Sequence, residues 1–243
     1  MLTASEVTKR FGGLTAVDSV DFSIDRGEIV GLIGPNGAGK TTLFNSIAGV
    51  YTPENGSIAF DGEELVGKSP HEIARQGISR TFQTARTFNE STVLDNVLAG
   101  AAFGKKDSGS LDEERENVWE YLEFIGLEDE AEADASSLTI AHRKQLELAR
   151  ALASEPDLIL VDEIGSGLTP AELGELSEDL QKTRDEFGIS VFWIEHVMDA
   201  IMAATDRIIV LNQGEKIADG APKRVQQDPH VAEAYLGGVE AQR

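Results

Sequence analysis

Residues 34–42 read Gly34-Pro35-Asn36-Gly37-Ala38-Gly39-Lys40-Thr41-Thr42, and this stretch decides the fold. It fits the phosphate-loop pattern G-x-x-x-x-G-K-[ST] at every fixed position. An apolar stretch, Glu28 to Ile33, precedes it, and Thr41 to Ala48 favours a helix after it. Glycines allow successive N–H groups to turn inward, and a helix N-terminus attracts anions. The stretch therefore predicts an ATP site in which Lys40 reaches the β- and γ-phosphates and Thr41 ligates Mg²⁺.

A second stretch places two acids at the end of a predicted strand. The apolar residues Leu158 to Val161 are followed directly by Asp162 and Glu163. In open α/β sheets, ligands bind at the carboxyl ends of the strands. We therefore expect Asp162 to hold the Mg²⁺ shell and Glu163 to orient or deprotonate the attacking water. Alone, the pattern is equally compatible with a solvated acidic turn; beside the phosphate loop it favours hydrolysis.

Three further side chains are candidates by position. His196 follows the apolar strand Val191 to Ile194, and Gln83 follows the predicted strand Ile78 to Thr81. His196 at a strand end can sense a γ-phosphate or serve as a structural hydrogen-bonder, and Gln83 can ligate Mg²⁺ or orient water. Phe11 can stack on an adenine ring, although an aromatic beside two glycines also serves plain packing. The remaining histidines show no metal-ligand spacing, and we expect His71 and His230 on the surface.

The spacing of apolar residues predicts an α/β fold. Val20, Phe22 and Ile24 alternate with polar residues, which is typical of a half-buried antiparallel strand. Later apolar strands alternate with helices predicted over 170–186 and 197–204, which indicates a mostly parallel sheet with helices on both faces. The middle, residues 84–153, is helical in pattern and is expected as an insertion. One face of a helix there is predicted to carry Leu111, Val118, Leu122 and Ile125.

Length and composition predict a protein that folds without stabilising cross-links and has no membrane-spanning helix. The 243 residues suit one large or two small domains, and 41% of them are hydrophobic. Cysteine is absent, which excludes a disulfide framework and favours a reducing cytoplasm. The N-terminus lacks a signal-peptide pattern, and no apolar run approaches the roughly 20 residues of a membrane helix.

The formal net charge of −22 narrows the partners. It disfavours a large contact with nucleic-acid phosphates, which needs a basic footprint, and equally disfavours an anionic lipid surface. Two interpretations stay open: a salt-adapted (halophilic) cytoplasmic protein, or one acidic interaction patch. The acids are spread along the chain, with a dense stretch from Asp107 to Asp134, and this spread favours salt adaptation.

The order of these motifs resembles the ATP-binding cassette (ABC) ATPase family over nearly the whole chain. The resemblance implies that Phe11 belongs to the adenine-stacking loop and residues 34–42 to the phosphate loop. It implies that Gln83 is the Q-loop residue, which touches Mg²⁺ and relays the nucleotide state to membrane domains. It also implies that Glu163, after Asp162, is the catalytic carboxylate.

The same resemblance implies that His196 is the switch histidine and that the chain is a single ABC ATPase domain, residues 1–243. In that family a helical subdomain and an antiparallel β subdomain accompany the nucleotide-binding α/β core. The implied boundaries are 1–30 and 56–66 for the β subdomain, 31–55 and 154–243 for the core, and 84–153 for the helical subdomain.

Finer features are similar to ATP-binding subunits of branched-chain amino-acid importers. The matching segments are Gly77 to Gln83, Gly167 to Pro170, Ile194 to Met198 and Ala234 to Gly237. This likeness implies permease subunits in the membrane, an extracytoplasmic binding protein, and a second ATPase or another copy of this chain. The chain would then lie on the inner face of the cell membrane, held by the permease. The alternatives are a different solute or a non-transport ABC ATPase; a GTPase or kinase lacks support because no N-K-x-D motif appears.

The chain departs from the family pattern at one segment and at two single positions. The family signature L-S-G-G-Q is matched by Leu138-Thr139-Ile140-Ala141-His142, which we call the signature-like segment. Ile164 stands in place of a proline, and Thr169 in place of an aspartate of the dimer-contact loop. In the family the signature completes the nucleotide site of the opposite subunit, so we expect this chain to bind ATP well and to activate a partner's site poorly.

Overall fold

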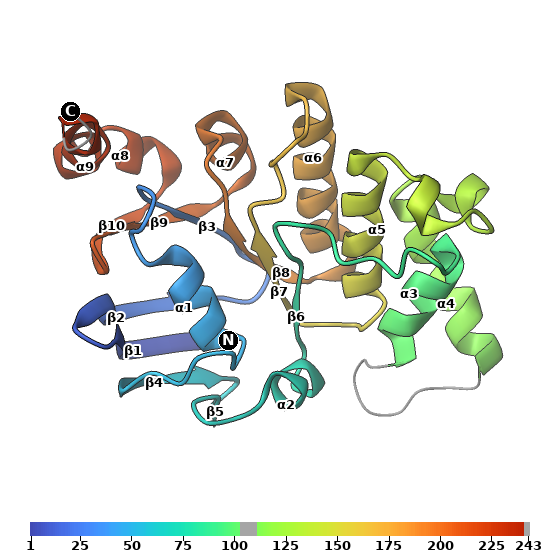
Figure 1. Ribbon diagram of the computed structural model, residues 1–243, viewed down its shortest axis with the longest axis horizontal. Helices are drawn as coiled ribbons and strands as arrows, with labels where there is room; N and C mark the ends of the chain where they lie inside the picture. The colour runs from blue at the N-terminus through green and yellow to red at the C-terminus, as the bar shows by residue number, and fades with distance from the viewer. Residues whose placement is uncertain (103–110, 241–243) are drawn as a thin grey trace. The chain divides into compact units, whose positions relative to one another are not determined.

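The computed structural model describes residues 1–102 and 111–240, with only the backbone described for residues 111–116 and 236–240 (Figure 1). The chain divides into two compact units. Unit 1 comprises Met1–Ile73 and Ser190–Arg243, and unit 2 comprises Ala74–Ile189. Helix α2 (Pro70–Arg75) carries the chain from the first unit into the second.

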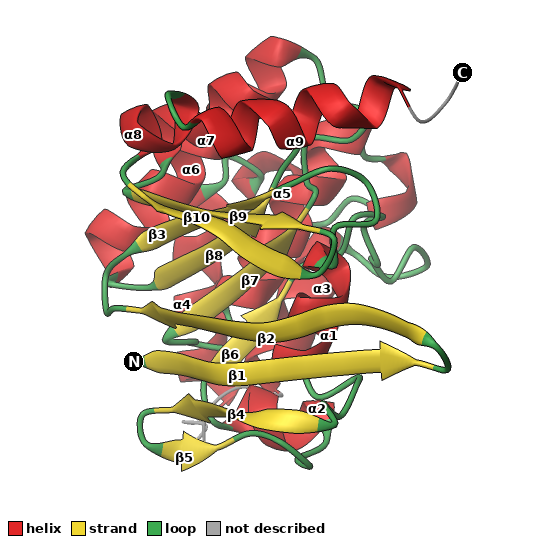
Figure 2. Cartoon of the chain, turned by 90° about the vertical axis from the view of Figure 1, so that its left-hand side faces the viewer, coloured by secondary structure: helices red, strands yellow, loops and turns green. Residues whose placement is uncertain are grey.

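Unit 1 contains an antiparallel sheet, as the alternating N-terminal pattern predicts (Figure 2). Its strands lie in the order β2-β1-β4-β5, with bounds β1 (Leu2–Phe11), β2 (Leu14–Ile24), β4 (Asn55–Phe60) and β5 (Glu63–Glu64). Val20, Phe22 and Ile24 on β2 are all buried, which confirms the predicted inward face. Phe11 pairs with Leu14 at the hairpin, so the exposed tip of this sheet carries the Phe11 ring.

A second set of strands in unit 1 carries the phosphate loop. It comprises β3 (Ile29–Ile33), β8 (Ser190–Ile194), β9 (Arg207–Asn212) and β10 (Glu215–Gly220). Strand β3 is parallel to both β8 and β9, as predicted, and all five of its residues are buried. Strand β10 pairs antiparallel with β9; its residues are half-buried or exposed, so no alternation marked it in the sequence.

The helices of unit 1 follow these strands. They are α1 (Lys40–Ile47), α7 (Met198–Ala204), α8 (Pro222–Gln226) and α9 (Pro229–Glu240). Helix α1 begins one residue earlier than the pattern predicts, and α8 and α9 were not predicted. Phe44 of α1 packs on Phe192 of β8 with ring centroids 4.9 Å apart, and Phe22 lies 5.4 Å from the same ring. These three rings join the antiparallel sheet, the parallel strands and α1 in one core.

Unit 2 contains a parallel strand pair and four helices. The strands are β6 (Ile78–Arg80) and β7 (Leu158–Asp162), and the helices are α3 (Val93–Ala102), α4 (Leu111–Phe124), α5 (Ile140–Leu152) and α6 (Pro170–Phe187). Short 3-10 turns span Glu128–Glu130 and Ala135–Ser137. The predicted helical character of residues 84–153 is therefore confirmed by α3, α4 and α5, whereas residues 103–110 lie outside the described residues.

The core of unit 2 forms where α3, α4, α5 and α6 pack. Val118, Leu122 and Ile125 are buried, as the helical face predicts, whereas the Leu111 side chain lies outside the described residues. Tyr121 packs against Phe187 of α6 with a centroid distance of 5.6 Å, and burial raises the pKa of Tyr121 to about 12. Throughout residues 1–102 and 111–240, the helices are too short or too polar to cross a bilayer.

Candidate nucleotide-binding site

The phosphate loop lies between the carboxyl end of β3 and the start of α1, in a conformation that requires glycine. Gly34, Gly37 and Gly39 have φ angles of 151°, 79° and 102°, which L side chains rarely adopt. A Cβ on Gly34 would lie 2.1 Å from the carbonyl oxygen of Leu211, and one on Gly39 would lie 2.2 Å from that of Ala16. At Gly34 and Gly39, the positive φ angle and the nearby carbonyl oxygen both disfavour any residue with a side chain, and at Gly37 the φ angle alone does so.

Lys40 is folded back over this loop. The side chain is 5% exposed, and its Nζ donates to the carbonyl oxygens of Gly34 (2.8 Å) and Pro35 (3.1 Å). The turn between β9 and β10 holds the loop from another side, since Gly214 N–H donates to the carbonyl oxygen of Ala38 (3.1 Å). Thr41 is exposed. The ammonium group thus lies over the loop while the Thr41 hydroxyl remains accessible to a cation.

Two aromatic side chains of unit 1 bear on nucleotide binding. The Phe11 ring is 42% exposed, with an edge-to-face contact to Tyr51 at 5.1 Å between centroids. Lys9 Nζ lies 5.3 Å from the centroid of the Phe11 ring. Lys9 Nζ also donates to Glu54 Oε1 (2.6 Å) and to the carbonyl oxygen of Thr52 (2.9 Å), so its charge is already paired. The exposed Phe11 ring itself offers a surface on which a base can stack. Lys9 precedes Phe11 by two residues on β1 and so shares its face of the strand, a spacing that the sequence already contains. Tyr51 lies in the loop between α1 and β4, and its contact with Phe11 is not encoded by any local pattern.

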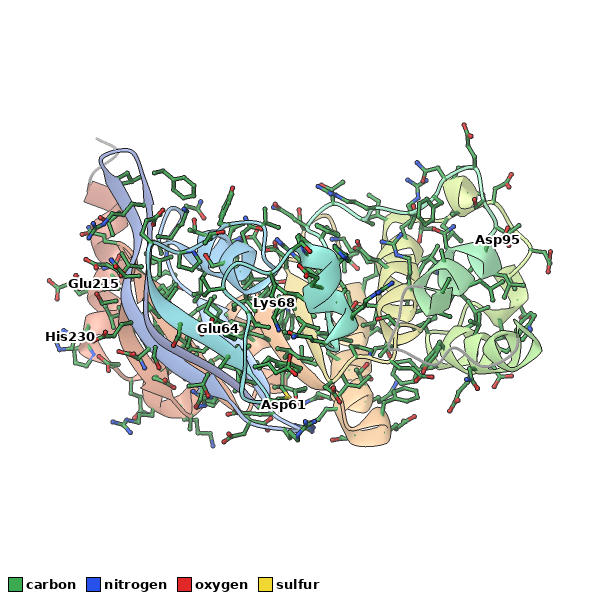
Figure 3. The ribbon with its side chains drawn as sticks, turned by 90° about the horizontal axis from the view of Figure 1, so that it is seen from below. Asp61, Glu64, Lys68, Asp95, Glu215 and His230 are labelled. Carbon is green, nitrogen blue, oxygen red and sulfur yellow. The ribbon has the colours of Figure 1, made fainter. Side chains whose placement is uncertain are left out.

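The C-terminal helix α9 also reaches the phosphate loop. The Tyr235 hydroxyl accepts a hydrogen bond from the backbone N–H of Gly34, and burial raises the pKa of Tyr235. A cavity of about 620 Å³ is lined by Pro35, Asn36, Gly37, Ala38, Asn212, Gln213, Ile217, His230, Glu233 and Ala234. His230 itself is exposed, and Figure 3 shows it with Glu215 at the same outer edge of unit 1. His71 is exposed as well, so both surface predictions are confirmed.

His196 lies directly after β8, on a turn held by its neighbour. The side chain of His196 is exposed, whereas that of Glu195 is only 3% exposed. Glu195 Oε1 accepts from the backbone N–H groups of His196 (2.7 Å) and Val197 (3.2 Å). The buried carboxylate therefore fixes the turn that presents the imidazole at the end of the strand.

In unit 2, Asp162 ends β7 as predicted, and an arginine engages it. Asp162 is 5% exposed, and its Oδ2 accepts from Arg80 at 2.7 Å. Arg80 lies on β6, opposite Leu160 in the parallel register. The guanidinium compensates a carboxylate whose burial unpaired would be costly. Arg80 carries no signal in the sequence that pairs it with a residue so distant along the chain.

Glu163 adopts a backbone conformation that is uncommon for a residue with a side chain. Its φ is 49°, in the left-handed region. Such outliers cost on the order of 1–3 kcal/mol and gather at functional sites. Ile164, which follows Glu163 and stands where the family pattern has a proline, is 4% exposed and packs as an apolar core residue.

Gln83 lies in a loop after β6 whose backbone is held by α5; we call residues 82–86 the glutamine loop. The Gln83 side chain is exposed, while its carbonyl oxygen accepts from Lys144 Nζ at 3.2 Å. The amide is thus available to a ligand although the backbone is tied down. Thr41, Gln83 and Asp162 supply hydroxyl, amide and carboxylate oxygens, which is the donor chemistry that Mg²⁺ prefers.

The signature-like segment forms the start of α5. Leu138 is buried, Thr139 is the N-cap, and Thr139 Oγ1 accepts from the backbone N–H of His142 at 3.1 Å. The Ile140 side chain is 59% exposed, and His142 Nδ1 lies 2.9 Å from Glu130 Oε1. A cavity of about 410 Å³ beside it is lined by Ile125, Gly126, Thr139, Ala141, His142, Gln145, Leu168, Glu172, Glu175 and Leu176. Carboxylates therefore lie next to the segment.

The phosphate loop, Phe11 and His196 thus belong to unit 1, whereas Gln83, Asp162, Glu163 and the signature-like segment belong to unit 2. Within each unit the candidate residues follow strand ends, strand hairpins or helix starts, as the sequence patterns predict. Arg80, Tyr51, Tyr235 and the residues of α5 that contact the glutamine loop are additions that the patterns did not predict as neighbours.

Comparison with known proteins is consistent with this arrangement. Residues 17–166 match a family model described as ABC transporter, and residues 215–241 match one described as branched-chain amino acid ATP-binding cassette transporter. The chain is 39% identical to the high-affinity branched-chain amino acid transport ATP-binding protein BraF of Pseudomonas aeruginosa, over 98% of each chain. It is 35% identical to the lipopolysaccharide export system ATP-binding protein LptB of Escherichia coli, over 97% of each chain.

Solved structures show the same fold. The ADP conformation of MJ1267, an ATP-binding cassette of an ABC transporter, has a TM-score of 0.88 at 33% identity and covers 98% of both chains. A dimeric structure of the cassette MJ0796 bound to ADP and Pi has a TM-score of 0.81 at 27% identity, covering 91% of this chain and 99% of that one.

Proposed function

Because the chain belongs to the ABC transporter family of ATP-binding cassettes, as its match over residues 17–166 shows, we propose that it powers the import of branched-chain or related amino acids. It is an ATPase with the P-loop α/β cassette fold. The observation that carries the proposal is similarity over 98% of the chain to a branched-chain amino acid transport ATPase, extending through the C-terminal segment 215–241. The 1–243 chain is proposed to act as one ABC ATPase domain with the three subdomains expected from its sequence.

The proposed roles follow from the chemistry of each side chain. The glycine-rich loop and Lys40 bind the phosphates, Phe11 stacks on the base, and His196 contacts the γ-phosphate. Glu163 accepts a proton from the water that attacks the γ-phosphorus, and ADP leaves with the electrons of the broken P–O bond. Glu163 has a φ of 49°, whereas Asp162 is the last residue of β7, so the two acids stand on different local backbone conformations and are proposed to have separate tasks.

Mg²⁺ fits the oxygen donors proposed for it. Thr41, Gln83 and Asp162 would hold the ion, which neutralises charge on the phosphate oxygens when it is bound. Asp162 is held through Oδ2 by Arg80 at 2.7 Å, and Oδ1 is the oxygen we propose for the ion. Arg80 therefore fixes the orientation of a metal-binding carboxylate, as residues behind metal ligands commonly do.

We propose that the working assembly is a heterodimer of this chain and a related ATPase, on the cytoplasmic face of permease subunits. Support comes from the signature-like segment: Ile140 adds an exposed bulky side chain, and Glu172 and Glu175 line the adjacent cavity. Carboxylates there would repel a triphosphate. A partner with an intact signature would complete the site on Lys40 and Glu163, whereas a homodimer would contain two weak signatures.

The acidic surface supports salt adaptation as a further part of the proposal. The acids labelled in Figure 3, which are Asp61, Glu64, Asp95 and Glu215, come from separate parts of the chain rather than from one segment. Several acids of the chain pair with basic side chains, as in Arg207 with Glu28 (2.7 Å) and Asp219 (2.8 Å). The large excess of acid remains solvated, as suits a concentrated-salt cytoplasm.

Transport by a reconstituted complex tests the proposed function. The chain would be purified with its permease and second ATPase, placed in proteoliposomes with the binding protein, and supplied with ATP. We expect uptake of labelled leucine, isoleucine or valine that stops when Lys40 is replaced by alanine. Extraction of lipopolysaccharide from the same membranes would instead favour the export function named for the LptB relative. If the chain shows no transport and does not bind the permease, the proposal is refuted.

A further inference from the structure

Three side chains on one face of α5 hold the backbone of the glutamine loop. Lys144, Glu147 and Arg150 are spaced three residues apart and therefore share a helix face. Lys144 donates to the carbonyl oxygen of Gln83 (3.2 Å), and Arg150 donates to that of Arg86. Glu147 Oε1 accepts from the backbone N–H of Arg86 (3.3 Å) and lies 3.7 Å from Arg150. Donors and acceptors of the loop backbone are thus both satisfied by one helix.

Glu147 is the most deeply buried member of this set. Its side chain is 1% exposed, and among the described residues its Oε2 has no hydrogen-bond partner. Burial raises the pKa of Glu147, while hydrogen bonds from the N–H groups of Arg86 and Phe82 oppose this. Burying a carboxyl group is costly unless its hydrogen bonds are made. An apolar residue would fill the same space more cheaply, so the acid points to a task at the loop.

The glutamine loop is also held by contacts outside α5. The guanidinium groups of Arg80 and Arg86 lie 5.2 Å and 4.2 Å from the centroid of the Phe82 ring. Phe88 lies two residues beyond the loop and is bound by Asn96 of α3. The Asn96 side chain accepts from the backbone N–H of Phe88 (2.7 Å) and donates to its carbonyl oxygen (3.1 Å). The segment is therefore held at Phe82, Gln83, Arg86 and Phe88, while the Gln83 side chain stays exposed.

The helix that holds this loop begins with the signature-like segment. Ile140 is the first residue of α5, and Glu147 follows it by seven residues, or roughly 10 Å along the helix axis. Such a short, regular helix transmits a displacement of one end to the other. The loop that carries Gln83 and the segment that carries Thr139 therefore share one rigid support.

We propose that Glu147 is a positioning residue that locks the glutamine loop to α5, so that Gln83 and the signature-like segment move as one body. Glu147 acts through the loop backbone and does not touch nucleotide. The inference rests on the proposed roles of Gln83 and of the membrane partner. The contact of Glu147 with the loop backbone would pass a change at the glutamine loop to the signature-like segment.

Amide hydrogen exchange on the isolated chain tests the lock directly. Glu147→Leu keeps the buried volume but removes the acceptor, so amides 82–86 should exchange about three- to tenfold faster, the value of one hydrogen bond. Glu147→Gln keeps a side-chain oxygen and should retain slow exchange. Glu178→Leu, an exposed change on α6, is the matched control and should leave the loop unaffected. Wild-type exchange in Glu147→Leu, or equally fast exchange in both Glu147 variants, would overturn the acceptor role.

Stimulation of hydrolysis by the membrane partner tests the consequence. In Glu147→Leu, stimulation should fall about tenfold while the ATP dissociation constant stays within about twofold of wild type; Glu147→Gln should restore most of the stimulation. A purely structural role would lower the melting temperature and leave stimulation intact in the folded fraction, and that result would overturn the coupling. If the partner fails to stimulate even the wild-type chain, the proposed transport function fails, whereas the exchange measurement still judges the lock.

Discussion

The phosphate loop and the signature-like segment are both helix starts, but they are built in opposite ways. At α1 the N-cap is Gly39, with a φ of 102° and no side chain to occupy the helix N-terminus. At α5 the N-cap is Thr139, whose hydroxyl oxygen accepts from the N–H of His142 in the first turn. One start is shaped for a ligand, whereas the other is capped by its own sequence.

Charge separates the two helix starts further. The buried Lys40 ammonium lies over the phosphate loop, while the cavity beside the signature-like segment is lined by Glu172 and Glu175. His142 is paired with Glu130 rather than directed to an outside anion. In the proposal, the backbone dipole of α1 acts on phosphate, whereas carboxylates lie beside the corresponding end of α5. This difference supports the proposal that the chain binds ATP itself and contributes little to a partner's site.

Glu163→Gln in the two-cassette complex gives the largest expected effect. If Glu163 is the base for the ATP on this chain, hydrolysis of the complex should fall by roughly 10²-fold or more. The residual rate reports the other site, which the signature-like segment completes and which we expect to be slow. ATP affinity should stay similar, because the change preserves shape. Steady-state hydrolysis and nucleotide titration check both quantities, and an unchanged rate would remove Glu163 from its role.

Lys40→Ala tests the phosphate-loop side of the comparison. Loss of charge-assisted hydrogen bonds to phosphate should weaken ATP binding by about 10- to 100-fold. Lys216→Ala, on β10 and paired with Asp219, is the matched control and should bind like wild type. Isothermal titration of the isolated chain with Mg²⁺-ATP measures both. Equal losses in the two variants would mean that net charge, and not the loop, governs binding.

Restoring glycine to the signature-like segment should narrow the difference between the helix starts. In Ile140→Gly with Ala141→Gly, the exposed bulk is removed and positive φ becomes accessible. We expect the partner's site, isolated by Glu163→Gln on this chain, to turn over several-fold faster. Thr139→Ser keeps the hydroxyl and should change little. If the two glycines do not raise the turnover rate at the partner's site, the surrounding carboxylates are the cause of its slow turnover.

Local patterns explain what the sequence predicts correctly. The phosphate loop is recognisable because its glycines, lysine and threonine all serve one contiguous backbone turn. Strands β3, β7, β8 and β9 are recognisable because parallel strands buried on both faces have no polar side. The cap at Thr139 was visible in principle, since a threonine before an amphipathic helix is a start signal.

Contacts between distant segments explain what the sequence does not predict. Arg80 and Asp162 are joined because two parallel strands lie side by side, and no spacing along the chain encodes that pair. The helix over α5 was predicted, but the residues facing the glutamine loop were not, since Lys144, Glu147 and Arg150 follow the same spacing as a solvated charged face. Strand β10 and helices α8 and α9 lack a clean apolar period and were missed.

A salt titration asks whether acidity is a property of the whole surface or of the region near the signature-like segment. Screening of a dispersed charge of −22 should raise the melting temperature steadily from about 0.05 M to 2 M KCl. The carboxylates beside the segment should be screened as well, so the slow site should gain rate in the same range. A flat or falling melting curve would favour one localised acidic patch.

Thr139→Val gives the smallest expected effect and decides what the Thr139 hydroxyl does. Loss of an N-cap costs about 0.5–2 kcal/mol, which for a chain of this size lowers the melting temperature by about 2–4 °C per kcal/mol. Thr169→Val removes the N-cap of α6, with its reciprocal bonds to Glu172, and serves as a matched measure of a lost cap in the same unit. Comparable losses in both variants would mean that each hydroxyl stabilises its own helix.

A hydroxyl that accepts from His142 keeps its proton as a donor, so activation of the partner's site must be measured in the same variant. If Thr139→Val melts like wild type but activates the partner less, the hydroxyl belongs to the partner's nucleotide, and the contrast between the two helix starts is smaller than their geometry indicates.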